Sequence, residues 1–252
     1  MFPLILKDGH TDEPDSPIYY EVAANGIFEV RETEMFRSVT RVSHDVPGLQ
    51  AGKEDLVVTA PRLPAALMED VVAFFGAVYR SCKGEGIVVL FYNTHEQRYH
   101  VEVPEQTIPV YKPFGRPWTT YLEVRYDRVD RPDGFVRCGT IHSHADQAAY
   151  ASHTDCTDEK HQDGLHAVVG DLHRADLSLT AAFTAAGHRF PMTTYDLIEP
   201  FDMDSAGRDT RQEWLERVLL EYPLPGGGKG LCSLAELERI RAARRHKAIG
   251  DA

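Results

Sequence analysis

Two adjacent segments constrain the fold most: an apolar run with helical spacing, and directly after it an uninterrupted apolar stretch. Residues 63–82, LPAALMEDVVAFFGAVYRSC, repeat apolar side chains at helical spacing, with Pro64 suited to the first turn and Gly84 to the stop. The stretch EGIVVLFYN, which starts at Glu85, has the composition of a buried strand. RYHVEV, from Arg98, is its expected hairpin partner. This part of the chain therefore predicts a helix next to a sheet.

Other segments add strands and helices on both sides. Residues 17–43 alternate apolar and polar positions around Asn25-Gly26, a strong hairpin signal. Further strands are expected at 120–129, 134–144, 165–172 and 177–190, helices at 208–221 and 233–246, a proline-rich irregular loop at 104–119 and a flexible glycine-rich linker at 223–230. This order favours an α+β fold around a mixed sheet, because it lacks the regular βαβ alternation of nucleotide-binding folds.

Composition excludes several classes of function. The net charge of −12 opposes binding to phosphate backbones, and the one basic cluster, residues 239–247, suits the solvated side of a helix. The chain has no dinucleotide or P-loop signature and no apolar run of membrane-spanning length. Four scattered cysteines without a C-x-x-C pair favour reduced thiols, and the N-terminus lacks a secretory signal, so we expect a cytoplasmic protein without membrane or nucleic-acid partners.

The stretch HSHADQAAYASHTD is the strongest candidate for a metal site. His142 and His144 lie two residues apart at the end of an expected strand, so both rings project from one face. Asp155 is well placed as a third ligand if a helix starts after Ala151, and Ser152 then shares its face. Two imidazoles and one carboxylate leave one position of a tetrahedral zinc ion open, which is typical of a catalytic site.

A catalytic zinc site also needs a group that moves a proton. Zinc lowers the pKa of a bound water from about 15.7 towards 7, and a carboxylate then takes that proton and passes it to the leaving group. Glu85 can project from a neighbouring strand, and Glu96, Glu102 and Glu105 compete with it on position alone. A hydroxyl at Ser152 suits stabilisation of an oxyanion.

These residues resemble the JAMM (JAB/MPN+) metallopeptidases, whose motif is an upstream Glu followed by H-[ST]-H-x7-S-x-x-D. The chain has His142, Ser143 and His144, then seven residues, then Ser152 and Asp155. In the family the Glu opens the strand after the first helix. Glu85 occupies that place.

The resemblance implies zinc ligands at His142, His144 and Asp155, with Glu85 as acid/base and Ser152 at the oxyanion. It implies a JAB/MPN-like curved mixed sheet flanked by helices over residues 61–202, with an N-terminal β-hairpin extension at 1–60 and a helical C-terminal tail at 203–252. The chain looks like prokaryotic JAB proteins associated with ubiquitin-like modifiers and their E1-like or E2-like enzymes.

The activity implied by the resemblance is cleavage after the C-terminus of a ubiquitin-like modifier, in a conjugate or a precursor. An edge strand would hold the modifier's tail, with residues 104–119 as a candidate wall carrying Tyr111, Phe114 and Trp118. Two positions depart from the family pattern. Ala145 follows the second histidine where many members have proline, and Val88 stands where glycine usually follows the acid.

Other functions compete for the same residues. A non-catalytic MPN scaffold would share the fold but characteristically loses zinc ligands, and all of them are present here. HSHAD, through Asp146, also begins the H-x-H-x-D-H signature of metallo-β-lactamase-like hydrolases, but Gln147 replaces the last histidine. A nucleophilic Cys156 is a further alternative, whereas His153, His161, His166 and His173 are expected to surround the metal site without binding the ion.

Overall fold

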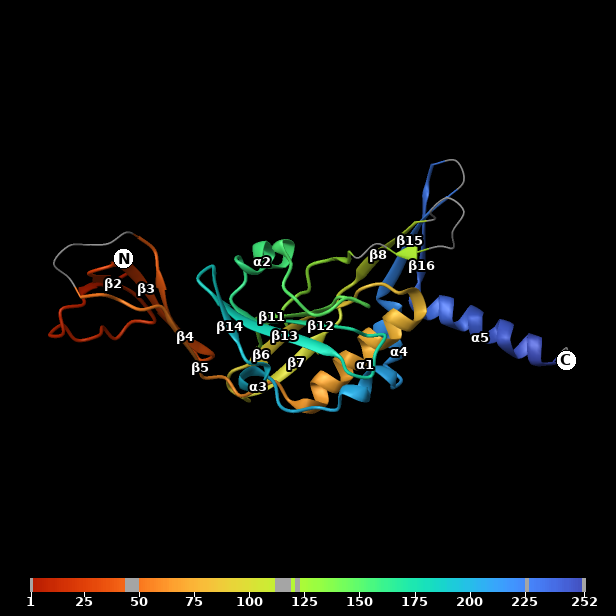
Figure 1. Ribbon diagram of the computed structural model, residues 1–252, viewed down its shortest axis with the longest axis horizontal. Coiled ribbons are helices and arrows are strands. Elements are labelled where there is room, and N and C mark those ends of the chain that lie inside the picture. The colour runs from red at the N-terminus through yellow and green to blue at the C-terminus, as the bar shows by residue number, and fades with distance from the viewer. Residues whose placement is uncertain (1, 44–49, 112–118, 121–122, 225–226, 251–252) are drawn as a thin grey trace.

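A six-stranded sheet forms the centre of the molecule in a computed structural model, which describes residues 2–43, 50–111, 119–120, 123–224 and 227–250 (Figure 1). Its strand order is β14-β13-β12-β11-β6-β7, and only the β11–β12 pair is parallel. The strands are β6 (Ile87–Asn93), β7 (Arg98–Glu102), β11 (Val136–Ser143), β12 (Gly164–Gly170), β13 (Ser178–Ala185) and β14 (His188–Met192). The expected strands in these regions are confirmed, and a turn at Ala186-Gly187, whose φ angles are 51° and 78°, divides residues 177–190 into β13 and β14.

Helix α1 (Ala65–Cys82) supplies much of the main core. Its side chains Met68, Val72 and Phe75 are fully buried and belong to the same apolar cluster as Leu90 of β6 and Ile141 of β11. The helix ends at Cys82, and its C-cap is Lys83, whose φ of 61° is left-handed, so Lys83 takes the place expected for Gly84. The predicted helix is therefore confirmed, and burial of its apolar face drives its packing.

The N-terminal segment forms a second sheet, at one end of the molecule in Figure 1. Its strands, in spatial order, are β1 (Leu4–Leu6), β2 (Ile18–Ala23), β3 (Gly26–Glu32), β4 (Phe36–Arg41) and β5 (Asp55–Val58). The Asn25-Gly26 hairpin is confirmed, with Gly26 at φ 142°. The extension contains five strands where we predicted a single hairpin, because short flanking runs also pair with it.

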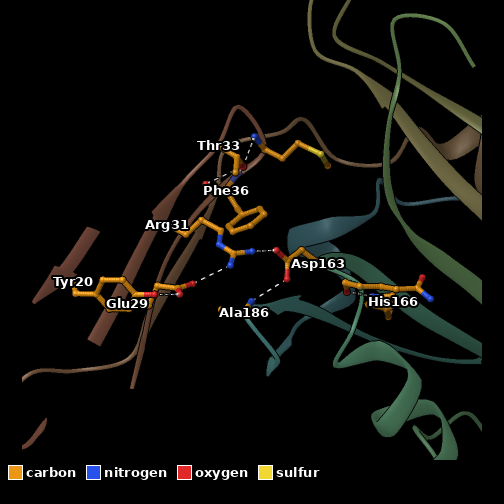
Figure 2. Close-up of polar contacts among 10 residues, drawn as sticks. Tyr20, Glu29, Arg31, Thr33, Phe36, Asp163, His166 and Ala186 are labelled. Carbon is orange, nitrogen blue, oxygen red and sulfur yellow. Dashed lines mark hydrogen bonds and ion pairs between the residues drawn. The ribbon is translucent and has the colours of Figure 1, made fainter. Parts of the chain in front are cut away.

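Figure 2 shows how the N-terminal sheet meets the central one. Arg31 of β3 bonds to Asp163, in the connection that leads into β12, and Asp163 Oδ1 accepts a hydrogen bond from Ala186 N at 2.9 Å. Phe36 of β4 packs edge-on against Phe183 of β13, with ring centroids 5.2 Å apart. Both polar and apolar contacts therefore join the two sheets.

A third sheet of order β10-β8-β15-β16 lies near the C-terminal end, with β9 also paired to β8. It corrects several predictions. Strand β8 (Gln106–Tyr111) occupies part of the expected loop. In the described part of 120–129, the expected strand is reduced to the end of β9 (Thr119–Thr120) and to β10 (Arg125–Tyr126). Helix α4 (Gln212–Glu216) forms within the expected helix 208–221, but β15 (Val218–Pro223) replaces the end of that helix, and β16 (Lys229–Ser233) begins in the expected linker, so the tail at 203–252 is not purely helical. VLLEYP pairs in parallel with β8 instead of continuing a helix, since a short apolar run suits either state.

Helices are few in the rest of the described chain. They are α2 (His153–Glu159), α3 (Thr194–Leu197), α4 (Gln212–Glu216) and α5 (Leu234–Gly250), with one 3-10 turn at Met203–Gly207. No described helix combines the length and apolar character that crossing a bilayer requires. The molecule is a mixed α+β protein with curved, unclosed mixed sheets, as the sequence predicted at this level.

Candidate metal centre

The end of β11 positions the two histidines. His142 is the penultimate residue of the strand and His144 follows its last residue. The backbone N–H of His144 donates to Val169 O of β12 at 2.8 Å, which holds the segment in the sheet. The two imidazole centroids are 5.1 Å apart, and both rings line one cavity. This arrangement agrees with the shared face that their spacing predicts.

Helix α2 brings Asp155 to the same place. Ser152 caps the helix: its Oγ accepts from Asp155 N at 3.2 Å, and Asp155 Oδ2 accepts from Ser152 N at 2.7 Å. Such a capping box fixes the first turn of a helix. Asp155 Oδ1 then lies 3.4 Å from His142 Nε2, and Oδ2 lies 3.6 Å from His144 Nε2. The predicted helix after Ala151 is confirmed.

The three side chains fit a metal ion. One candidate ligand atom from each lies within 4.8 Å of the others. Two ligands about 2.1 Å from a tetrahedral zinc ion are roughly 3.4 Å apart, close to the distances from Asp155 to the two histidines. His142 Nε2 is buried and forms no hydrogen bond within the described chain, so it retains a lone pair or proton for another partner. The group can therefore hold a metal ion.

Ionisation of the group also suits a cation. Burial raises the pKa of Asp155, but close polar contacts and charge interactions with His142 and His144 outweigh burial and hold that pKa well below its usual range. The carboxylate is thus ionised over the ordinary pH range. Burial lowers the pKa of His144, but Asp155 and Glu85 more than offset it, so the net shift is upward.

Glu85 lies next to His144, in the segment that leads into the adjacent strand β6. Ile87 pairs with His142, and Ser143 exchanges two bonds with Gly86: the Ser143 N–H donates to Gly86 O and the Gly86 N–H donates to Ser143 Oγ, each at 2.9 Å. This antiparallel register places Glu85 beside the histidines although it precedes β6 by two residues. The sequence predicted the neighbourhood, but β6 starts at Ile87 and not at Glu85.

The environment of Glu85 is unusual for a carboxyl group. Its exposed fraction is 9%, and it lines the cavity that contains the three candidate ligands. Burial is the main cause that raises the pKa of Glu85 to about 7, and His144 and His142 partly oppose it. A carboxyl group with this pKa can both accept and donate a proton near neutrality.

The competing glutamates lie elsewhere. Glu96, in the β6–β7 turn, is exposed and pairs with Arg98. Glu102 pairs with Arg217 at 2.7 Å, and Glu105 is exposed beside it in a separate depression. Neither these two nor Glu96 line the metal cavity.

The cavity around the candidate ligands has a volume of about 630 Å³. Tyr150 forms one side, with its ring 4.7 Å from that of His144, and Ser152 lies nearby at the start of α2. Glu123, Val124 and Tyr126 form another wall. The described part of the expected wall at 104–119 does not line this cavity, but Pro109 and Val110 line another pocket together with Glu123. The aromatic side chains of Tyr111, Phe114 and Trp118 lie outside the described residues.

The remaining histidines are not grouped with the candidate ligands. His153, His161 and His173 are exposed, as is Asp146, and none of the four lines the cavity. His166 lines it, but its ring nitrogens already contact Thr140 Oγ1 and Gln162 O, each at 2.9 Å. Cys156 is half-buried on α2 and does not line the cavity.

Sequence reasoning missed Gln106, which supports the site from β8. Its side chain is 1% exposed; Oε1 accepts from Ile87 N at 2.9 Å, and Nε2 donates to Ile87 O at 3.0 Å. The Gln106 amide thus forms the two hydrogen bonds with Ile87 that a neighbouring strand would otherwise form, next to the segment that carries Glu85. A polar residue in a proline-rich stretch carries no signal for such a role, so only the fold reveals it.

Comparison with known proteins adds no relative: no family model matches the chain, and no curated protein is similar enough to be matched. The fold and the site therefore define a mixed α+β protein with a candidate His-His-Asp metal centre.

Proposed function

We propose that the protein is a zinc-dependent hydrolase whose metal is held by His142, His144 and Asp155. The observation that carries the proposal is the buried carboxyl group of Glu85 in the same cavity as these three side chains. The two nitrogen ligands and one oxygen ligand match the composition of catalytic zinc sites. Zinc in such a site acts as a Lewis acid that activates water and polarises a carbonyl group.

Two residues of the chain then perform the proton transfer and charge stabilisation. Glu85 takes a proton from the attacking water and delivers it to the leaving amine, a role that its burial in the cavity of the candidate ligands supports. The Ser152 hydroxyl lines the cavity, and its oxygen accepts from Asp155 N, so its proton remains able to donate to a developing oxyanion.

The reaction that we propose is peptide or isopeptide cleavage after the C-terminus of a ubiquitin-like modifier, in a conjugate or a precursor. The support is the order of elements: a long helix, a glutamate before a buried strand, two histidines at the end of the next core strand, and a short helix capped by Ser152 that carries the aspartate. This order is the one that the JAMM resemblance requires, and it favours a JAB/MPN-like fold for the central part. E1-like or E2-like proteins of the same pathway are the partners that we propose.

The main alternative, a non-catalytic scaffold of the same fold, requires no buried acid beside the ligands. The metallo-β-lactamase-like alternative requires Asp146 near the metal, and this residue is exposed outside the cavity. The placement of Glu85 and Asp146 therefore favours the hydrolase that we propose over both.

The test combines zinc analysis with cleavage of C-terminal fusions of ubiquitin-like proteins. We expect one zinc per wild-type chain. Glu85→Gln should retain zinc and lose activity by about 10²- to 10⁴-fold, the range of a general base. His142→Ala should lose both zinc and activity, and the exposed control His153→Ala should keep both zinc and activity. Full activity of Glu85→Gln would contradict the proton-transfer role, and wild type without zinc would contradict the enzyme.

A further inference from the structure

A second cavity lies where the N-terminal sheet meets the central sheet. Its volume is about 380 Å³, and Arg31, Phe36, Thr94, Arg137 and Gly164 are among the residues that line it. None of its lining residues lines the metal cavity. The β6–β7 turn, the start of β11 and the start of β12 therefore border, with β3 and β4, an open cavity between the two sheets.

Arg137 is the unusual residue of this cavity. A β-bulge between Arg137 and Gly139 shifts the register of β11, and Cys138 is buried in the main core. The Nε and Nη2 atoms of Arg137 are buried and have no hydrogen-bond partner within the described chain. No described carboxylate forms an ion pair with Arg137. A guanidinium group is charged at any ordinary pH, so these two buried nitrogen atoms can donate hydrogen bonds to an anion in the cavity.

The carboxylates that line the cavity form no ion pair with Arg137 in the described chain. Asp163 is engaged by Arg31 and by Ala186 N, as Figure 2 shows. Glu34 lines the cavity but forms no ion pair with Arg137 in the described chain. Arg31 Nε is also buried without a partner. Folded proteins leave few buried polar atoms unsatisfied, because burying a polar group without a hydrogen-bond partner is unfavourable, and more so when the group is charged.

We propose that this cavity binds a small organic anion, a carboxylate or a phosphate ester, through the guanidinium group of Arg137. The planar guanidinium fork matches both anions and binds them with charge-assisted hydrogen bonds. Phe36 and Phe183 give the cavity an apolar side that suits the organic part of the ligand. Cavities of this size between structural units are common ligand sites.

The anion site is distinct from the metal centre. Arg137 and His142 lie five residues apart on β11, a separation of roughly 16 Å along an extended strand. Anions bound at Arg137 therefore do not contact the candidate zinc ligands. Anions also bind zinc directly, so binding must be measured in a protein that cannot hold the metal.

The experiment uses the full chain with His142→Ala, titrated with benzoate, phenyl phosphate, succinate and inorganic phosphate at constant ionic strength. Calorimetry should show saturable binding of at least one organic anion, and the carboxylate and phosphate series identify its class. Arg137→Gln in the same background should bind about 10- to 100-fold more weakly, as expected for loss of a charged hydrogen-bond donor. Arg174→Gln removes an exposed arginine paired only with Asp176 and should bind like the parent.

Absence of saturable binding, or equal binding by the Arg137→Gln protein, would overturn the proposal. If Arg137→Gln does not fold, the His142→Ala parent is treated with phenylglyoxal, which modifies arginine, and the modified peptides are identified by mass spectrometry. The bound anion should protect Arg137 and leave Arg174 equally reactive. Equal modification of Arg137 with and without the anion would also overturn the proposal.

Discussion

At the scale of the residue, Ser143 links the two halves of the proposed mechanism. It stands between the two histidines, is fully buried, and joins Gly86 through both its backbone and its hydroxyl group. The candidate ligands and the candidate acid/base are thereby held by adjacent residues of two paired strands. A single buried serine therefore sets how far Glu85 lies from His144.

The burial of Glu85 has a consequence for stability without metal. Its pKa in the folded protein, about 7, is above its ordinary value of about 4.5, so folding favours the protonated form. Its contribution is fully present below about pH 4.5 and is lost as pH rises through about 7. We expect metal-free Glu85→Gln to exceed wild type in stability by up to about 3 kcal/mol at pH 8.

The measurement is urea unfolding of both metal-free proteins from pH 5 to pH 8. The advantage of Glu85→Gln should grow with pH across this window. A difference in stability that stays constant with pH would show that burial does not raise the pKa of the Glu85 carboxyl group.

Ala145 has a backbone conformation that bears on one departure from the pattern of the JAMM proteins, which the sequence resembles. Its φ is +50°, whereas proline is restricted to φ near −65°, so the family's proline cannot occupy this backbone. We expect Ala145→Pro to destabilise the metal-free protein by about 3 kcal/mol and to weaken zinc binding through His144. Ala145→Gly tolerates the positive φ and should stay within about 1 kcal/mol of wild type.

Unfolding and zinc titration of the two variants provide the check. If Ala145→Pro retained both wild-type stability and zinc affinity, this segment would instead adopt the backbone of the family's proline.

At the scale of the element, strand β8 supports the acid/base segment through one side chain. Gln106 satisfies both the N–H and the C=O of Ile87, which are buried. Gln106→Leu leaves these two groups unpaired, and each unpaired group costs about 1–3 kcal/mol. We expect this loss of stability together with reduced hydrolysis. The zinc content should not change, because the ligands lie at the end of β11 and on α2.

Urea unfolding and zinc analysis test this prediction, with the exposed Gln212→Leu of α4 as a control expected within about 0.5 kcal/mol of wild type. If Gln106→Leu were as stable as its control, the amide would have no supporting role.

Elements predicted well are those whose signal is local. The periodicity of α1, the Asn25-Gly26 turn and the apolar runs of β6 and β12 each specify one structure through their own residues. Most of the strand at Val218–Pro223 falls within the expected helix 208–221, because its partner, β8, is distant in sequence. The same reason applies to the site. Spacing within residues 142–155 predicts its ligands, but Gln106 reaches the site only through tertiary packing.

At the scale of the molecule, the N-terminal sheet is both separate and attached. It has a small core of its own, composed of Tyr19, Ala23, Phe28, Val30 and Val39. Phe36 and Met35, however, belong to the main core, where Phe36 meets Phe183. The expected extension is thus joined to the central domain by side chains that both parts bury.

Variants of two phenylalanines of the N-terminal sheet test the contribution of each core separately, because Phe36 belongs to the main core and Phe28 to the small core. Phe36→Ala should destabilise the central domain by about 3–5 kcal/mol, because it removes a ring from the main core and leaves a cavity against Phe183. Phe28→Ala removes a ring of similar burial from the small core. It should lower the stability of the N-terminal sheet and affect the central domain less.

Hydrogen exchange read at β6 and β11 distinguishes the two effects, because it reports opening of each region separately. Phe36→Ala should increase exchange in these central strands, whereas Phe28→Ala should increase it mainly in β2 and β3. Equal increases in the central strands would mean that the two sheets unfold as one cooperative unit. In that case the ion pair between Arg31 and Asp163 would contribute to this coupling together with Phe36. Asp163 lies in the connection that follows α2, the helix that carries Asp155.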